Sequence, residues 1–224
     1  MLQTSTLKFL KDLKKNNNKP WFDANRKVYD AAKADFISFI DTVIEKHGKK
    51  DPSIAHLAAK DCIFRINRDV RFSKDKSPYK SNMGAYINKD GKKGISAGYY
   101  FHCEPGAAFG GGGLYMAPPD QLKNIRQEID YNWKEFQKII NSKKFKAVFG
   151  DLSTEGDMKL SRPPKGYEAD NPAIEYLKLK SWVGMQQFSD ADLTSKDLVK
   201  KVCTNFETLQ PLLQFLNEGL HAGE

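Results

Sequence analysis

The stretch that decides the fold reads NMGAYINKDGKKGISAGYYFHC and covers residues 82–103. Its two halves, 82–88 and 94–103, carry strand-forming residues that repeat with a period of two. Lys89–Lys92 separates them, and Gly91 in this separator can adopt the positive φ that a tight hairpin needs. The stretch therefore predicts two antiparallel strands joined by a short turn.

The second half of this hairpin has two chemically different faces. Successive side chains of a strand point to opposite sides, so alternate residues share a face. Tyr100 and His102 lie on one face, and an apolar set lies on the other: Ile95, Ala97, Tyr99, Phe101 and Cys103. This pattern is typical of a strand that buries one side against a core. His102 is the one histidine that stands out, although a histidine in this position is more often an ordinary half-buried residue than an acid or base.

The same period of two extends outward from the hairpin. Residues 62–72 alternate in the same way and predict a strand, and residues 107–116 predict another. Together these segments form an expected antiparallel meander over residues 62–116. A further strand is expected at residues 181–188.

Helical periodicity replaces the strand pattern on both sides of the meander. Apolar residues recur at helical spacing over 20–47, 119–141 and 195–217, which predicts a helix over each range. Helices, then a run of strands, then helices indicate an α+β fold. We therefore expect a single α+β domain over residues 1–224, with an antiparallel sheet flanked by N-terminal and C-terminal helices.

Composition bounds the class of protein. Hydrophobic residues make up 40% of the chain and aromatic residues 12%, which is enough for a core and excludes a disordered chain. The cysteines are few, odd in number and far apart (Cys62, Cys103 and Cys203), which favours a reducing compartment. The sequence has no long apolar run for a signal peptide or a membrane span. We expect a cytoplasmic protein without membrane partners.

Positive charge is concentrated in one segment. The chain has 36 Lys and Arg against 28 Asp and Glu, a net charge of +8. Residues 60–80 contain seven basic and three acidic residues, a net of +4. Because arginine and lysine bind phosphate and carboxylate oxygens, this segment predicts an anion-binding site. The candidate ligand residues are Arg65, Arg68, Arg71, Lys76 and Lys80.

Arg68 is the critical residue of this segment. In an unbroken strand over 62–72 it would share a face with Phe64 and Ile66 and would point into the core. A buried guanidinium is costly unless it is paired, so either a carboxylate or an anionic ligand must hold it, or the chain must turn near Asn67. We predict that Arg68 is largely buried and charge-paired. An internal salt-bridge network with Asp61, Asp69 and Asp75 is the alternative to a ligand site.

Two glycine motifs predict structure rather than catalysis. Gly110–Gly113 has no following G-K-[ST], so it is no phosphate-binding loop and indicates a closely packed strand. Residues 94–98 match G-x-S-x-G, but a nucleophile elbow needs a helix directly after the turn, and here a strand continues. The histidines and cysteines lack the spacing of a metal site, and no motif predicts a cofactor.

Several segments resemble a bacterial protein family known as domain of unknown function 2461. They are Phe9–Asn17 with Trp21-Phe22, Phe64–Phe72 with Lys76–Lys80, Gly98–Tyr100, Gly111–Tyr115, and Pro163–Tyr167 with Leu179–Ser181. The resemblance covers nearly the whole chain, and its arginine-rich motif is specific. It implies one full-length domain and carries no catalytic residue or cofactor.

Three functions remain open at this point. The basic residues could line a pocket for a phosphorylated small molecule or nucleotide, such as an enzyme's substrate, and this interpretation is favoured. They could form a groove for nucleic acid, or they could be internal supports of an interaction module. A closed concave site would indicate a small ligand, whereas an open basic stripe would indicate nucleic acid. The sequence does not decide whether the chain is an enzyme, or its oligomeric state.

Overall fold

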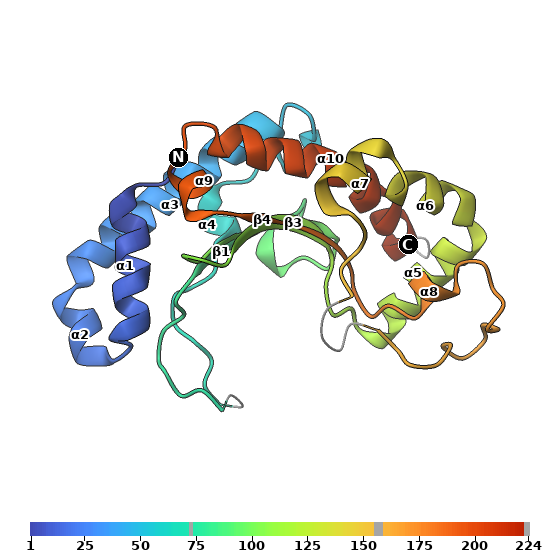
Figure 1. Cartoon of the computed structure of the whole chain (residues 1–224), viewed down its shortest axis with the longest axis horizontal. Helices are drawn as coiled ribbons and strands as arrows, with labels where there is room; N and C mark the ends of the chain where they lie inside the picture. The colour runs from blue at the N-terminus through green and yellow to red at the C-terminus, as the bar shows by residue number, and fades with distance from the viewer. Residues whose placement is uncertain (72–73, 155–158, 222–224) are drawn as a thin grey trace. The chain divides into compact units, whose positions relative to one another are not determined.

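The computed structural model describes residues 1–71, 74–154 and 159–221 and has an α+β fold (Figure 1). The antiparallel sheet has the strand order β1-β2-β3-β4, so the predicted fold class is confirmed. Its strands are β1 (Met83–Ile87), β2 (Gly98–Cys103), β3 (Ala108–Leu114) and β4 (Trp182–Phe188). The two halves of the 82–103 hairpin form β1 and β2, and η2 (Gly91–Lys93) lies between them, with Gly91 at φ +70°.

The predicted strand over residues 62–72 is wrong. Helix α4 (Ala59–Cys62) takes its first residue, and the following residues make only isolated antiparallel bridges, Ile63 to Ala85 and Asn67 to Tyr79. Phe72 lies outside the described residues. Polar and apolar side chains do alternate in this segment. The segment, however, pairs with β1 at Ile63 and has left β1 by Asn67, which pairs with Tyr79.

Helices supply the rest of the structure. On the N-terminal side they are α1 (Thr4–Lys15), α2 (Lys19–Ala24), α3 (Arg26–His47) and the short η1 (Pro52–Ile54). After the meander come α5 (Pro119–Tyr131), α6 (Trp133–Ile140), α7 (Lys143–Phe149), α8 (Ile174–Leu177), α9 (Asp190–Thr194) and α10 (Leu198–His221). None of these described helices has the length and apolar character needed to cross a membrane.

Two of the predicted helices are interrupted. The expected helix over 20–47 divides at Asn25, and the one over 119–141 divides at Asn132. Asparagine side chains hydrogen-bond nearby groups and so compete with the helix. Asn25 Nδ2 donates to the carbonyl oxygen of Trp21 at 2.9 Å, and Asn132 Nδ2 donates to Glu128 at 2.6 Å. Gly48 caps the end of α3.

The chain divides into two compact units. The first comprises residues 1–94, 100–110 and 187–204, and the second comprises residues 95–99, 111–186 and 205–224. In the first, Phe39 of α3 packs on Phe101 with ring centroids 4.9 Å apart. In the second, Tyr99 stacks on Phe206 of α10 at 4.7 Å. The predicted apolar face of β2 is therefore buried, whereas Ile95 precedes the strand and is exposed.

The four consecutive glycines form part of β3, and their interpretation as a packed strand is confirmed. A methyl group on Gly112 would lie 3.0 Å from Tyr99 Cα, and one on Gly111 would lie 3.2 Å from Met185 Cα. Within the second unit, neighbouring backbones therefore fill the space that side chains would need. Gly94–Ala97 precede β2, and Gly98 begins it, so the G-x-S-x-G match forms no strand–turn–helix elbow.

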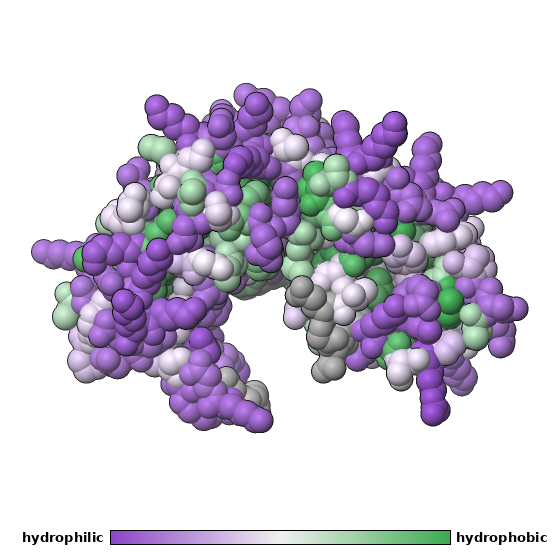
Figure 2. Space-filling model, viewed as in Figure 1, coloured by the Kyte–Doolittle hydropathy of each residue, from purple (hydrophilic) through white to green (hydrophobic). Residues whose placement is uncertain are grey.

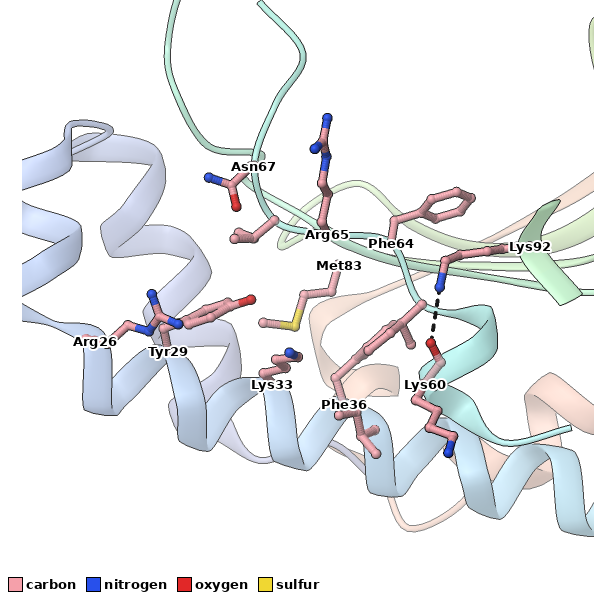
Figure 3. Close-up of a pocket in the computed structure, with 13 residues that line it drawn as sticks. Arg26, Tyr29, Lys33, Phe36, Lys60, Phe64, Arg65, Asn67, Met83 and Lys92 are labelled. Carbon is pink, nitrogen blue, oxygen red and sulfur yellow. Dashed lines mark hydrogen bonds between the residues drawn. The ribbon is translucent and has the colours of Figure 1, made fainter.

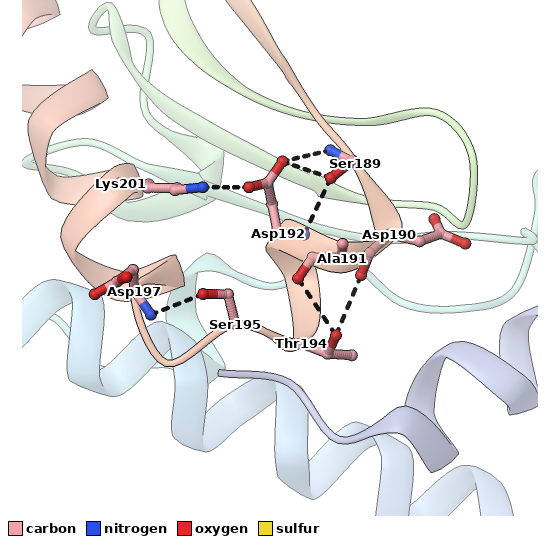
Figure 4. Close-up of polar contacts among 8 residues, drawn as sticks. All are labelled: Ser189, Asp190, Ala191, Asp192, Thr194, Ser195, Asp197 and Lys201. Atoms are coloured by element: carbon pink, nitrogen blue, oxygen red, sulfur yellow. Dashed lines mark hydrogen bonds and ion pairs between the residues drawn. The ribbon is translucent and has the colours of Figure 1, made fainter.

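Helix α9 begins with a reciprocal cap (Figure 4). The Ser189 hydroxyl accepts a hydrogen bond from the Asp192 N–H at 3.1 Å, and Asp192 accepts one from the Ser189 N–H at 2.9 Å. Lys201 of α10 pairs with Asp192. These donors, with Lys201 the strongest, hold the pKa of Asp192 well below its usual range. The Ser195 hydroxyl likewise accepts a hydrogen bond from the Asp197 N–H just before α10.

Candidate functional site

The described residues 66–71 and 74–80 form a projecting loop that we call the basic hairpin. Its base is a short antiparallel ladder, in which Arg68 N–H donates to the Pro78 carbonyl at 2.9 Å and Lys80 N–H donates to the Ile66 carbonyl at 2.8 Å. The ring of Tyr79 stacks on Phe22 of α2 at 4.0 Å, which anchors the ladder in the first unit. The hairpin extends beyond β1 and its surface is hydrophilic (Figures 1 and 2).

Two arginines of the hairpin are paired internally. Arg68 pairs with Asp75, and 29% of its side chain is exposed. Arg68 is therefore less buried than predicted, because the chain leaves the sheet at this point, whereas the predicted charge pairing is present. Arg71 makes a two-pronged pair with Asp69, through hydrogen bonds of 3.0 and 2.7 Å. Exposed pairs of this kind contribute little to stability, so removing Arg68 should cost far less than breaking a buried pair.

The two lysines of the predicted set have different surroundings. Lys76 Nζ donates to the Val70 carbonyl at 2.9 Å and so closes the hairpin loop. Lys80 Nζ lies 5.5 Å from the centroid of the Phe64 ring. Burial lowers the pKa of Lys80, and the charges of Arg65 and Arg68 lower it further. Lys80, Arg65 and Arg68 therefore form a zone of positive charge at the base of the hairpin.

Arg65 lines a pocket of about 690 Å³ beside this base (Figure 3). Five of the lining residues are cationic: Arg26, Lys33, Lys60, Arg65 and Lys92. None of the described residues that line it is acidic. Its apolar lining includes Phe36, Ile63 and Met83. The pocket thus combines an apolar lining with several positive charges.

Helix α3 forms one wall of the pocket. Arg26, Tyr29, Lys33 and Phe36 are spaced by three, four and three residues, so they lie on one helical face. Tyr29 and Met83 point toward one another across the pocket (Figure 3). Burial raises the pKa of Tyr29, so its hydroxyl is a neutral hydrogen-bonding group at physiological pH.

Residues 60–67 and the turn after β1 form the other wall. Lys92 Nζ donates to the Lys60 carbonyl at 3.1 Å, which ties the turn to α4 (Figure 3). Arg26 makes an exposed ion pair with Asp30 on its own helix, at 3.3 Å. Within the described part of the chain, Lys33, Lys60 and Arg65 have no ion-pair partner at 4.0 Å or less, so their charges remain available to a ligand.

The pocket contains one of the five residues predicted from the sequence, Arg65. Arg68, Arg71, Lys76 and Lys80 belong to the basic hairpin and do not line it. Sequence reasoning missed the cations of α3, α4 and η2. The spacing of Arg26 and Lys33 could have placed both on one helical face, but nothing local indicates which segment packs opposite them.

Neither metal ligation nor thiol chemistry is indicated in the described residues. No group of three His, Cys, Asp or Glu side chains is arranged to hold a metal ion there. The three cysteines form no disulfide. Burial raises the pKa of Cys62 to about 11 and that of Cys103 to about 12, so both stay protonated and weakly reactive at neutral pH.

Comparison with known families gives one match. Residues 5–215 match the model of a family described as conserved hypothetical protein (DUF2461), which confirms the resemblance noted in the sequence. This description names no activity, ligand or partner. No curated protein and no solved structure matches the chain.

Proposed function

This chain belongs to the DUF2461 family, and we propose that it binds a phosphorylated small molecule in the pocket between α3 and residues 60–67. One observation carries the proposal: five cationic side chains line the pocket, and no described lining residue is acidic. Three of these cations, Lys33, Lys60 and Arg65, have no ion-pair partner among the described residues. Clustered positive charge of this kind is self-repelling, and a bound polyanion relieves that repulsion.

The pocket also indicates which kind of phosphorylated molecule fits. Its volume of about 690 Å³ lies within the usual range for small-ligand sites. Phe36, Ile63 and Met83 offer an apolar surface, and Tyr29 offers a hydroxyl beside it. We expect a ligand with two or more negative charges and a planar or apolar part, as in a nucleotide. Free cysteines are consistent with the proposed cytoplasmic location.

One observation favours nucleic acid as the second candidate. The Phe64 side chain is exposed, with 41% of its surface accessible, and Lys80 lies over its ring. An aromatic side chain beside a cation can stack a base of a single strand. The concave shape of the pocket still favours the small ligand, because a single-stranded nucleic acid needs an open groove.

Calorimetric titration with inorganic pyrophosphate and with ADP, at low and high salt, tests this proposal. We expect wild-type protein to bind one of them, and a Lys33→Ala/Lys60→Ala variant to bind it about 100-fold more weakly. Each lost charge-assisted hydrogen bond costs about 1.5 kcal/mol, and about 1.4 kcal/mol is a tenfold change in affinity.

The matched control removes two exposed lysines elsewhere. Lys138→Ala/Lys144→Ala changes the net charge equally and should leave the affinity unchanged. Equal binding by the Lys33/Lys60 variant and the control would rule out the pocket. Binding of a single-stranded oligonucleotide, weakened by Phe64→Ala and not by the Lys33/Lys60 variant, would replace the proposal with the nucleic-acid function.

A further inference from the structure

A second polar cluster lies on the β2 face that carries no core residues. Tyr100 and His102 alternate with the buried Phe101 and Cys103, and Glu104 follows directly after the strand. The period of two therefore places Tyr100, His102 and Glu104 in a row on one face. All three belong to the first unit, and none of them lines the pocket described above.

These three side chains form a continuous hydrogen-bonded chain. Tyr100 Oη lies 3.2 Å from His102 Nδ1, and His102 Nε2 lies 3.2 Å from Glu104 Oε2. The other carboxylate oxygen, Glu104 Oε1, accepts hydrogen bonds from Lys14 Nζ at 3.2 Å and from Ser81 Oγ at 3.1 Å. Burial favours the neutral form of Glu104, but the hydrogen bonds from His102, Lys14 and Ser81 outweigh it and lower its pKa.

This arrangement fixes the roles of the two imidazole nitrogens. An ionised carboxylate only accepts hydrogen bonds, so His102 Nε2 must carry the proton that points to Glu104. In the neutral imidazole, Nδ1 is then an acceptor, and the Tyr100 hydroxyl donates to it. A hydroxyl, a base and a carboxylate that orients the base are the three parts of an activated nucleophile.

The packing around Tyr100 holds this geometry in place. The His102 ring stacks on Phe109 with centroids 4.9 Å apart. A methyl group on Gly84 would lie 2.6 Å from Tyr100 Oη, so any larger residue at position 84 would require the hydroxyl to shift. Burial raises the pKa of Tyr100 to about 12, so an unassisted hydroxyl there would be less reactive than a free one.

Positive charge lies next to the cluster. The ring of Phe64 is 6.4 Å from that of Tyr100, and Lys80 Nζ lies 5.5 Å from the centroid of the same Phe64 ring. Arg65 is close enough to Lys80 to lower its pKa, after the larger effect of burial. A negatively charged electrophile would therefore be attracted to the Tyr100 hydroxyl.

We propose that Tyr100, His102 and Glu104 form a nucleophilic site for a phosphate ester, separate from the binding pocket. Tyr100 Oη attacks phosphorus, a new O–P bond forms, and the bond to the leaving oxygen breaks with its electron pair on that oxygen. The Tyr100 proton passes to His102 Nδ1, and the imidazolium stays hydrogen-bonded to Glu104. The imidazolium then gives that proton to the leaving oxygen. Water attacks the phosphotyrosyl phosphorus while neutral His102 takes the water proton, the bond from phosphorus to the Tyr100 oxygen breaks, and His102 returns the proton to Tyr100.

Labelling with aryl sulfonyl fluorides tests this site without knowledge of the natural substrate. The Tyr100 oxygen forms a bond to sulfur, fluoride leaves, and His102 takes the proton, as in the proposed step. Peptide mass spectrometry compares Tyr100 with Tyr131, a residue that is 75% exposed. Burial alone makes Tyr100 the slower of the two, whereas activation by His102 makes it faster.

We expect Tyr100 to react faster than Tyr131 in the wild type, and His102→Gln to slow Tyr100 on the order of 100-fold, the usual contribution of a general base. Labelling of Tyr131 should not change. The control is His56→Gln, which alters an exposed histidine outside the cluster and should leave Tyr100 unaffected. Circular dichroism shows whether each variant is folded.

Two further variants separate positioning and charge from folding. Glu104→Gln should move the His102 proton between its nitrogens, a change that nitrogen NMR detects, and should slow labelling. Lys80→Ala should remove the preference of Tyr100 for 4-(fluorosulfonyl)benzoate over a cationic sulfonyl fluoride.

Slower labelling of Tyr100 than Tyr131, or an unchanged rate in folded His102→Gln, would overturn the site. No preference for the anionic probe in the wild type would overturn the phosphate assignment. If the Lys33/Lys60 variant bound its ligand as tightly as the wild type, the pocket proposal would fail. The labelling results at Tyr100 would not be affected, because they concern other residues.

Discussion

Replacing Gly113 with alanine is expected to prevent stable folding of the second unit. Gly113 has φ +137°, a backbone conformation that side chains rarely adopt. Its added methyl group would overlap the Trp182 carbonyl oxygen and lie 2.8 Å from Val183 Cα. Both are backbone atoms of β4, so relief requires the strands to separate. We expect a loss of roughly 4 kcal/mol or more, in the range that marks severe backbone and packing defects.

Chemical denaturation, followed by circular dichroism, measures this loss. Gly166→Ala is the matched control, because Gly166 also has a positive φ of +92° but has no atom within 4 Å of the added methyl group. The control isolates the cost of the backbone conformation, which is about 1–2 kcal/mol. If Gly113→Ala lost no more stability than Gly166→Ala, the close approach of β3 and β4 would be refuted.

Truncating Trp182 should have the next largest effect. Trp182 is fully buried, and its indole Nε1–H donates to the Tyr176 carbonyl at 3.0 Å. Trp182→Ala removes a large apolar volume and leaves that carbonyl without its donor. We expect a loss of about 3–5 kcal/mol, typical for Trp to Ala in a core.

A comparison of two variants separates the contributions at Trp182. Trp182→Phe keeps most of the ring volume and removes the donor, so it should lose less stability than Trp182→Ala. Tyr131→Ala, at an exposed aromatic residue, should change the unfolding free energy by about 0.5 kcal/mol or less. A Trp182→Ala protein as stable as Tyr131→Ala would show that β4 does not bury this side chain.

The hairpin of β1 and β2 was predictable because its pattern is local. The apolar side chains of β2 repeat every second residue, and burial of Tyr99, Phe101 and Cys103 on one face follows from that period alone. The same period placed Tyr100 and His102 on the opposite face. It also places Glu104 on that face, although the sequence analysis did not identify this residue. The spacing Tyr-x-His-x-Glu was the signal that could have revealed the cluster.

The segment after α4 shows where a local pattern misleads. Phe64 and Ile66 alternate as strand residues do, yet a strand needs a partner along its length, and Ile63 and Asn67 find partners in two different places. The segment therefore crosses from Ala85 of β1 to the returning arm of the basic hairpin. Pairing of this kind is decided by tertiary contacts, which propensity cannot reveal.

The pocket could not be assembled from the sequence for a similar reason. Its cations come from α3, from residues 60–65 and from the turn at Lys92, and the outermost two, Arg26 and Lys92, are 66 positions apart in the chain. Charge density predicted the segment that contributes Arg65. It could not distinguish Arg65 from Arg71, which Asp69 neutralises, because which carboxylate reaches which arginine depends on how the hairpin closes.

Methyl NMR of the methionines tests the central claim, an anion-binding pocket beside α3, most directly. Met83 lines the pocket, whereas Met116 and Met185 do not, and Met83→Leu assigns its signal. On titration with ADP or pyrophosphate, the account predicts a saturable shift of the Met83 methyl signal, with those of Met116 and Met185 unchanged. A saturable shift at Met116 or Met185 with Met83 unmoved, or no shift at any of the three with either ligand, would contradict it.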